Sequence, residues 1–273
     1  MRKIVGLFLV MGLAVALWGQ QPPKQPAPKS KQELEAVLAV QNAADPDARI
    51  KAAEELLAKF ADTDFKEFAL QMETLSHQQK NDFDNMMIAG GRTLEVNGDN
   101  VIVLITLAQS IPQRTREHDL DKDEKLGKAE KYARKAQALL PNLPKFNPQI
   151  SDEDWMGYKK GAMSQAHEAL GMVAFTRRDF AAAEKSFKQA AEIAPQPDPA
   201  TLYRLGMTYA TQNKLDEAMA AMDQAIAAGG VKVGDKDLAA EEKARLAKLK
   251  AAGGAAAKPA APPAAPQVEI KRP

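Results

Sequence analysis

The segment from residue 164 to residue 230 contains one residue pattern twice, at a fixed spacing. Leu170-Gly171 of the first copy returns as Leu205-Gly206 in the second, 35 residues later. The same spacing relates Ala174, Ala183, Phe187, Ala190 and Pro195 to Tyr209, Ala218, Met222, Ala225 and Gly230. Self-similarity at a period of about 20–50 residues is typical of stacked repeat architectures. The chain is therefore expected to stack similar small units rather than fold around one central core.

The residue types within one copy predict a pair of helices. Gly171 shares a helical face with Leu170, and its lack of a side chain allows another helix to approach closely. A second stretch carries Ala183 and Phe187 at helical spacing and is ended by Pro195. The repeating unit is therefore expected to be two antiparallel helices with small residues at their crossing.

These two copies, at residues 164–197 and 199–232, resemble the tetratricopeptide repeat (TPR), whose signature L-G-x2-Y…A-x3-F…P runs at about 34 residues. The sequence departs from the signature at Ala174, His167, Met222 and Gly230, where the repeat usually has Tyr, Trp, an aromatic residue and Pro. The resemblance rests on eleven positions, and it implies that these residues maintain the fold of the repeat. They are Leu170, Gly171, Ala183, Phe187, Ala190, Pro195, Leu205, Gly206, Tyr209, Ala218 and Ala225.

Weaker helix-pair patterns precede the two clear repeats. Degenerate repeats are expected at about 64–100 and 101–141, and the second has 9 extra residues in its turn, around 112–121. A further insertion from 142 to about 163 should open a helix at Ser151, carrying Trp155 as a core aromatic rather than a surface contact. No stretch alternates in the manner of a strand. The fold class expected is all-α, an α-solenoid of stacked antiparallel helix pairs over residues 30–250.

Both ends of this helical domain carry helix-start signals. Ser30 with Glu33 three residues later forms a capping-box pattern for a first helix. Asp47 is expected to cap the next helix. Residues 237–250 form a charged, Ala/Leu-bearing segment suited to covering the open end of a solenoid.

The two chain ends are expected to lie outside the folded domain. Arg2 and Lys3 precede an apolar run at residues 4–18, a pattern typical of a signal peptide over residues 1–20. The run is shorter than the stretch of about 20 apolar residues that a membrane-spanning helix needs. The alternative is an uncleaved anchor in the inner membrane. Residues 21–29 are Pro-rich and should form an extended linker, and residues 251–273 are an Ala/Pro-rich tail expected to be disordered. The expected location is therefore periplasmic or secreted.

Composition and motifs favour a non-catalytic protein. The net charge of +1 gives no argument for nucleic acid, and the chain has no cysteine for a nucleophile, a lipid anchor or a disulfide. No G-x-S-x-G, H-E-x-x-H, P-loop or G-x-G-x-x-G pattern is present. We expect no catalytic residues and no cofactor.

One partial metal motif lies in the first insertion. Asp119, Asp121, Asp123 and Glu130 have the spacing of positions 1, 3, 5 and 12 of an EF-hand calcium loop. Glu124 stands where that loop needs glycine. The alternative interpretation is an acidic first turn of a helix, which the helix dipole favours.

The TPR resemblance implies a concave face lined by the first helix of each repeat, which holds a partner segment. The residues expected there are Ile105, Gln109, Gln165, Glu168, Met172, Phe175, Tyr203, Arg204 and Met207. The lining is expected to be apolar and Met-rich with few charges, which suits adaptable binding of an amphipathic segment. The alternative is that the chain's own insertions or tail cover these residues.

The function expected is that of a non-catalytic scaffold or adaptor in the bacterial cell envelope, which binds another protein or peptide in the concave groove. The arrangement resembles small exported TPR proteins of bacteria. Contact with a membrane is expected only through an uncleaved N-terminal segment. The rival interpretations are a membrane-anchored structural component of the envelope and, less favoured by the residues, a metal-binding protein or an enzyme.

Overall fold

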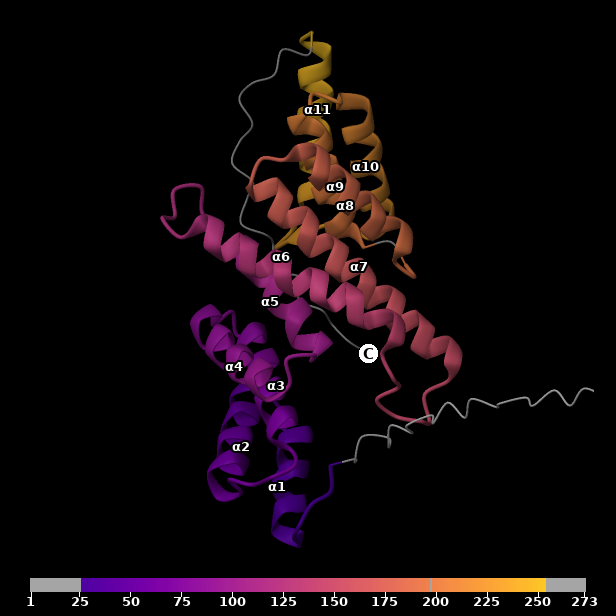
Figure 1. Cartoon of the computed structure of the whole chain (residues 1–273). Helices are drawn as coiled ribbons and strands as arrows, with labels where there is room; N and C mark the ends of the chain where they lie inside the picture. Colours follow the sequence, from indigo (N-terminus) through magenta and orange to yellow (C-terminus); the bar gives the residue numbers. More distant parts are fainter. Residues whose placement is uncertain (1–25, 197, 254–273) are drawn as a thin grey trace, which may run out of the picture.

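A computed structural model describes residues 26–196 and 198–253 of the 273-residue chain. The described part contains eleven α-helices, which follow one another along one axis from α1 at one end to α11 at the other (Figure 1). The helices are α1 (Lys31–Gln41), α2 (Pro46–Lys59), α3 (Lys66–Gln79), α4 (Phe83–Val96), α5 (Val101–Arg114), α6 (Lys122–Leu139), α7 (Asp152–Thr176), α8 (Phe180–Ile193), α9 (Pro199–Thr211), α10 (Leu215–Ala227) and α11 (Leu238–Ala251).

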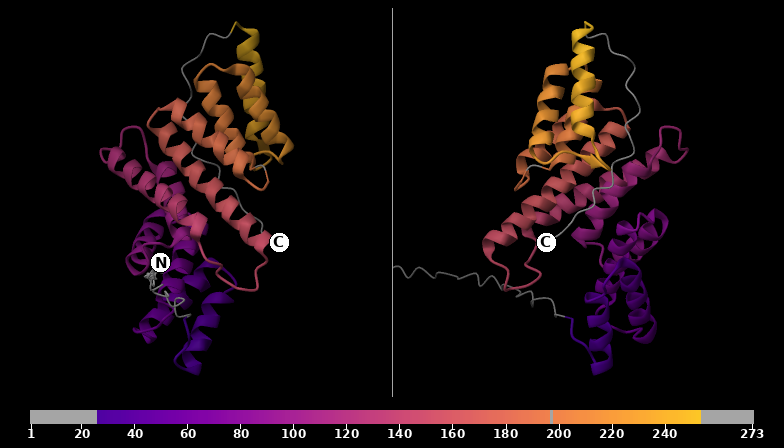
Figure 2. Two further views of the ribbon diagram at one scale, coloured as in Figure 1. Left: turned by 45° about the vertical axis from the view of Figure 1, so that its right-hand side comes forward. Right: turned by 180° about the vertical axis from the view of Figure 1, so that it is seen from behind.

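Consecutive helices pack as antiparallel pairs, and each pair packs on the next. The pairs are α1–α2, α3–α4, α5–α6, α7–α8 and α9–α10, with α11 covering the last of them. The elongated stack is also clear in a view turned by 45° and in the view from behind (Figure 2). The predicted fold class, an α-solenoid of stacked helix pairs, is thus confirmed for the described residues.

Side-chain caps set several helix starts. The Ser30 hydroxyl accepts a hydrogen bond from the Glu33 amide at 3.1 Å, as the sequence predicts. The predicted cap of the second helix is wrong: the cap is Asp45, whose carboxylate accepts from the Ala48 amide at 2.8 Å. Pro46 explains the shift, because proline lacks the amide hydrogen that the first helical residue would leave unpaired and its ring presets the helical φ.

The turn inside three helix pairs has one geometry. Asn81, Arg178 and Asn213 occupy it with φ values of 58°, 65° and 58°, in the left-handed region. The next residue donates its amide hydrogen to a carbonyl five positions earlier in each repeat, for example from Asp179 to Ala174 at 2.9 Å and from Lys214 to Tyr209 at 3.0 Å. The equivalent bond of the α3–α4 pair shows that this degenerate unit keeps the repeat's backbone turn.

The crossing of the two helices in a pair is where small residues are needed. In α7, a Cβ added to Gly171 would lie 2.6 Å from the Phe187 ring, so the ring packs directly on the helix backbone. In the α3–α4 pair, threonine side chains occupy the crossing of the two helices. Thr74 and Thr93 are fully buried there, their hydroxyl oxygens lie 3.4 Å apart, and Thr93 also bonds its own helix backbone.

The two insertions are accommodated without interrupting the stack. The first is partly helical, because α5 continues past Pro112 to Arg114 and leaves residues 115–121 as the turn. The second runs from the short 3-10 helix Leu140–Asn142 to Ser151, whose hydroxyl caps α7 as predicted. Trp155 is 6% exposed, so the prediction that it is a core residue is confirmed.

A small hairpin, which the sequence analysis did not predict, separates the last repeat from α11. Its strands β1 (Lys232–Val233) and β2 (Lys236–Asp237) pair antiparallel. Asp237 holds this junction, because its carboxylate accepts hydrogen bonds from the Val231 amide at 3.1 Å and the Ala239 amide at 3.0 Å. The predicted capping helix follows, and Leu246 of α11 is fully buried in the core of the last repeat.

Candidate functional site

The first helices of three successive pairs are joined by a chain of polar side chains. Gln109 of α5 donates from its amide nitrogen to a Glu168 carboxylate oxygen of α7 at 2.8 Å. Arg204 of α9 donates from its guanidinium to the other oxygen of the same carboxylate. One carboxylate therefore links three repeats across the face that the TPR resemblance assigns to partner binding. We call Gln109, Glu168 and Arg204 the polar ladder.

Glu168 is the buried centre of the polar ladder. Its side chain is 9% exposed and that of Arg204 is 18% exposed. Burial raises the pKa of the Glu168 carboxyl, while the Arg204 guanidinium opposes that rise. A buried ion pair of this kind contributes little net stability, but loss of one partner leaves the other charge unpaired. The ladder is therefore better suited to fixing the spacing of the three helices than to stabilising them.

The other predicted groove residues divide by exposure. Ile105 is 4% exposed, and Met172 and Tyr203 are 7% exposed, so these three belong to the core of the stack. Gln165 is exposed, and Phe175 and Met207 are half-buried. Three of the predicted apolar residues are thus buried in the stack, whereas three of the predicted polar residues form the polar ladder. That this face binds a partner stays a prediction.

Tyr203 lies at the end of this face that is next to the capping helix. It belongs to the same apolar cluster as Leu246 of α11. Burial raises the pKa of the Tyr203 hydroxyl, and Glu242 of α11 adds to that rise. Charged side chains of the capping helix therefore lie near Tyr203, while the helix itself packs mainly against α10.

The period contained a signal for the polar ladder that the sequence analysis did not use. Glu168 and Arg204 are separated by 36 positions, one period plus one residue. Residues at that separation lie at nearly equivalent places on neighbouring first helices, so opposite charges there are expected to meet. Gln109 and Glu168 are separated by 59 positions, which no simple period predicts because the insertions intervene.

The calcium alternative is not supported by the geometry. Glu130 receives hydrogen bonds from Arg134 at 2.7 Å and from Arg177 at 2.6 Å. The Asp119 carboxylate accepts from the Arg116 amide at 3.1 Å, and Lys125 lies 2.9 Å from an Asp121 oxygen. Across residues 26–196 and 198–253 there is no group of three or more His, Cys, Asp or Glu side chains that is arranged to hold a metal ion. Asp121 and Asp123 instead lie at the start of α6, where the dipole favours acidic residues.

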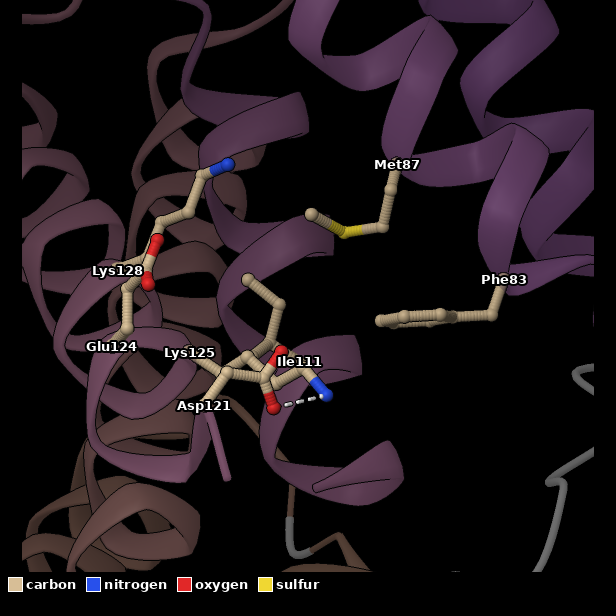
Figure 3. Close-up of a pocket in the computed structure, with 7 residues that line it drawn as sticks. All are labelled: Phe83, Met87, Ile111, Asp121, Glu124, Lys125 and Lys128. Atoms are coloured by element: carbon tan, nitrogen blue, oxygen red, sulfur yellow. Dashed lines mark ion pairs between the residues drawn. The ribbon is translucent and has the colours of Figure 1, made fainter. Parts of the chain in front are cut away.

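A cavity lies away from the concave face, where α4, α5 and α6 meet (Figure 3). It has a volume of about 140 Å³ and is lined by Phe83, Met87, Ile111, Asp121, Glu124, Lys125 and Lys128. Phe83 and Met87 come from α4, and four charged side chains face them from the start of α6. The sequence analysis did not identify this cavity, because its residues come from three helices of two successive pairs.

Helix pairs with a common turn, small residues at each crossing and first helices aligned on one face define a TPR-type solenoid. Comparison with protein-family models agrees: residues 174–230 match the tetratricopeptide repeat model. The chain therefore carries tetratricopeptide repeats in this segment, and the predicted resemblance is confirmed. A comparison with curated protein sequences finds no match.

Two solved structures show the same fold at low sequence identity. A thermophilic TPR protein of Thermus thermophilus is 19% identical with a TM-score of 0.53, over 80% of this chain and 100% of that one. An assembly chaperone of RpL4 (residues 1–338) is 17% identical with a TM-score of 0.52, over 79% of this chain and 82% of that one. Both similarities extend well beyond residues 174–230, so the solenoid architecture covers the degenerate repeats as well.

Proposed function

We propose that this protein is an exported, non-catalytic adaptor that binds a segment of another protein along the face formed by α5, α7 and α9. A TPR fold suggests a scaffold for protein–protein interaction, and TPR proteins are generally non-catalytic. The observation that supports this face is the polar ladder, which holds the three first helices at a set spacing. A preorganised surface loses less conformational entropy on binding than one that must be ordered.

The side chains around the polar ladder indicate what kind of segment would bind. Gln165 offers an exposed amide, which donates and accepts hydrogen bonds. Phe175 of α7 and Met207 of α9 are half-buried, so part of the apolar surface of each is accessible. Such a combination suits an amphipathic helix or an extended segment that contributes apolar anchors and backbone polar groups. The partner is therefore proposed to be a protein segment rather than a nucleic acid or a small cofactor.

A pair of matched methionine variants tests this proposal. Met207 lies on the first helix of the last repeat and Met219 on the second helix, and both are partly buried against the same core. The wild type, Met207→Glu and Met219→Glu would each be used to capture proteins from a cell-envelope extract, after circular dichroism has shown that all three are folded. We expect one partner to be lost with Met207→Glu and retained with Met219→Glu. Equal capture by both variants would refute binding on this face.

Export is proposed from residues 1–20, which lie outside the described residues. Residues 21–25 of the predicted linker (21–29) and residues 254–273 of the predicted tail (251–273) lie outside them as well. Within the described ranges, no helix has both the length and the apolar character that crossing a bilayer demands. Mass spectrometry of the protein from its native cells distinguishes the two forms. A new N-terminus near residue 20 supports free export, whereas an intact Met1 supports the membrane-anchored structural alternative.

A further inference from the structure

The cavity between α4, α5 and α6 has an apolar floor and a charged rim. Phe83, Met87 and Ile111 form the floor, and the side chains of α6 stand across from them (Figure 3). Lys125 is engaged at the rim, since it lies 2.9 Å from an Asp121 oxygen. Lys128 has no ion pair with a side chain of the described residues, and its ammonium lies 6.0 Å from the centre of the Tyr132 ring. An apolar group that enters this cavity would therefore meet an available cation at its edge.

The inserted turn next to this cavity presents an apolar side chain to solvent. Leu120 is 107% exposed, the highest value among the exposed large hydrophobic residues of the described chain. Its neighbour Asp121 lines the cavity, so the two features lie one residue apart, about 3.8 Å between Cα atoms. Leu120 itself does not line its own cavity.

The turn that carries Leu120 is held in place by hydrogen bonds. The Asp119 carboxylate accepts from the Arg116 amide at 3.1 Å and from Lys125 at 3.3 Å. The Lys122 amide donates to the Asp119 carbonyl at 3.2 Å. These bonds fix the backbone on both sides of Leu120, so the side chain is presented outward without the ordering cost that a free loop would bring to an interface.

We propose that this surface is a twofold dimer interface, in which Leu120 of one copy enters the α4–α5–α6 cavity of a second copy. A twofold interface is self-complementary, and therefore needs a projecting group and its receptor on one patch of the same chain. A cavity of about 140 Å³ is close in size to one of about 150 Å³ that admits benzene, so the four carbon atoms of a leucine side chain fit in it. Size and position both match.

Charge favours a second copy over an unrelated apolar segment. Leu120 stands between Asp119 and Asp121, and the side chain of Asp121 is 53% exposed. The rim of the other copy carries two carboxylates, Asp121 and Glu124, and two lysines. Lys125 is already paired with Asp121, so Lys128 is the rim group that the acidic flank of an inserted Leu120 would meet favourably. The arrangement is reciprocal, so each dimer gains the contact twice. This inference is independent of the proposed partner-binding face, which is centred on the polar ladder.

Sedimentation velocity of the full chain tests the proposal, over about 1 µM to 1 mM, the range in which small interfaces associate. We expect the wild type to form a dimer as concentration rises. Leu120→Glu should raise the dissociation constant by at least roughly 100-fold, because every dimer buries two copies of the side chain. Val233→Glu is the matched control, since Val233 is also an exposed apolar residue (48%) and lies in the distant hairpin. Because Leu120 is fully exposed, its variant should remain folded.

Cross-linking then tests the position of the contact. The chain has no cysteine, so engineered thiols are the only ones present. A Leu120→Cys chain mixed with a Lys128→Cys chain should form a disulfide-linked heterodimer under mild oxidation, whereas Val233→Cys mixed with Lys128→Cys should not. A wild type that stays monomeric over the whole range overturns the proposal. A dimer that Leu120→Glu leaves unchanged overturns it equally, because association must then use another surface.

Discussion

Two glycines in α7 lead to opposite expectations for the same substitution. A Cβ built on Gly161 has nothing within 4 Å, whereas one built on Gly171 would lie 2.6, 2.7 and 2.9 Å from three atoms of the Phe187 ring. Alanine in a helix is favoured over glycine by about 0.5–1 kcal/mol. Gly161→Ala should therefore stabilise the protein by about that amount.

Gly171→Ala has the same helical gain but must displace a buried ring. Phe187 is 1% exposed, so it has no free space into which to move. Overpacking of this kind costs typically about 1–3 kcal/mol, which leaves a net loss of about 0–2.5 kcal/mol after the helical gain. At about 2–4 °C per kcal/mol for a domain of this size, Gly161→Ala should melt about 1–4 °C higher than the wild type and Gly171→Ala up to about 10 °C lower.

Thermal unfolding followed by circular dichroism measures both shifts. The mechanism is tested by adding Gly171→Ala to a Phe187→Leu background, where the smaller side chain leaves room for the new methyl group. There the substitution should be neutral or stabilising, which a double-mutant cycle reports as coupling between the two positions. If Gly171→Ala alone melts at or above the Gly161→Ala variant, the close contact of ring and helix is not the constraint that we infer.

Further predictions concern charge and the repeat turn. Hydrogen bonds from Lys188, Lys214 and Gln212 lower the pKa of the Glu184 carboxyl from 4.5 to about 2. Because the folded-state pKa is lowered, the stabilisation by the Glu184 carboxylate is complete above pH 4.5 and is lost as the pH falls towards 2. The melting temperature of Glu184→Gln should therefore fall less steeply than that of the wild type between these pH values. An equal fall in both proteins would contradict the lowered pKa of Glu184. Arg204→Met should lower the free energy of unfolding, measured in urea, by about 3–5 kcal/mol, because the buried Glu168 carboxylate loses its ion-pair partner. Adding Glu168→Gln to the same chain should restore most of that free energy, because no buried charge is then left without a partner. Asn213→Ala should lower stability by about 1 kcal/mol, because φ is 58° there, whereas Asn213→Gly should not; equal effects of the two would exclude backbone strain as the cause.

The repeating unit was predictable from the sequence because its determinants are local and recur. Gly171 and Phe187 lie within one repeat, and their types already indicate a close crossing. Ser30 and Ser151 cap the helices that follow them, as their positions in the sequence predict. The choice between Asp45 and Asp47 was missed because both can cap, and only the position of Pro46 at the helix start decides between them.

The candidate sites depended on how the repeats stack. The sequence places the predicted face on the first helices of the repeats, but it did not show that Met172 and Tyr203 would be buried in the stack. Nor did it show that Gln109 would reach Glu168, because residues 115–121 and 142–151 loop out between those positions. The cavity behind Leu120 likewise needs three helices in their final places.

The sequence by itself therefore determined the unit of this protein: its period, its helix pairs, their crossings and their caps, all of which arise from contacts between residues close in the chain. The tertiary structure alone decided which faces of those units remain open. Exposure depends on the displacement of each pair relative to the next, and that displacement results from the packing of all the side chains between repeats.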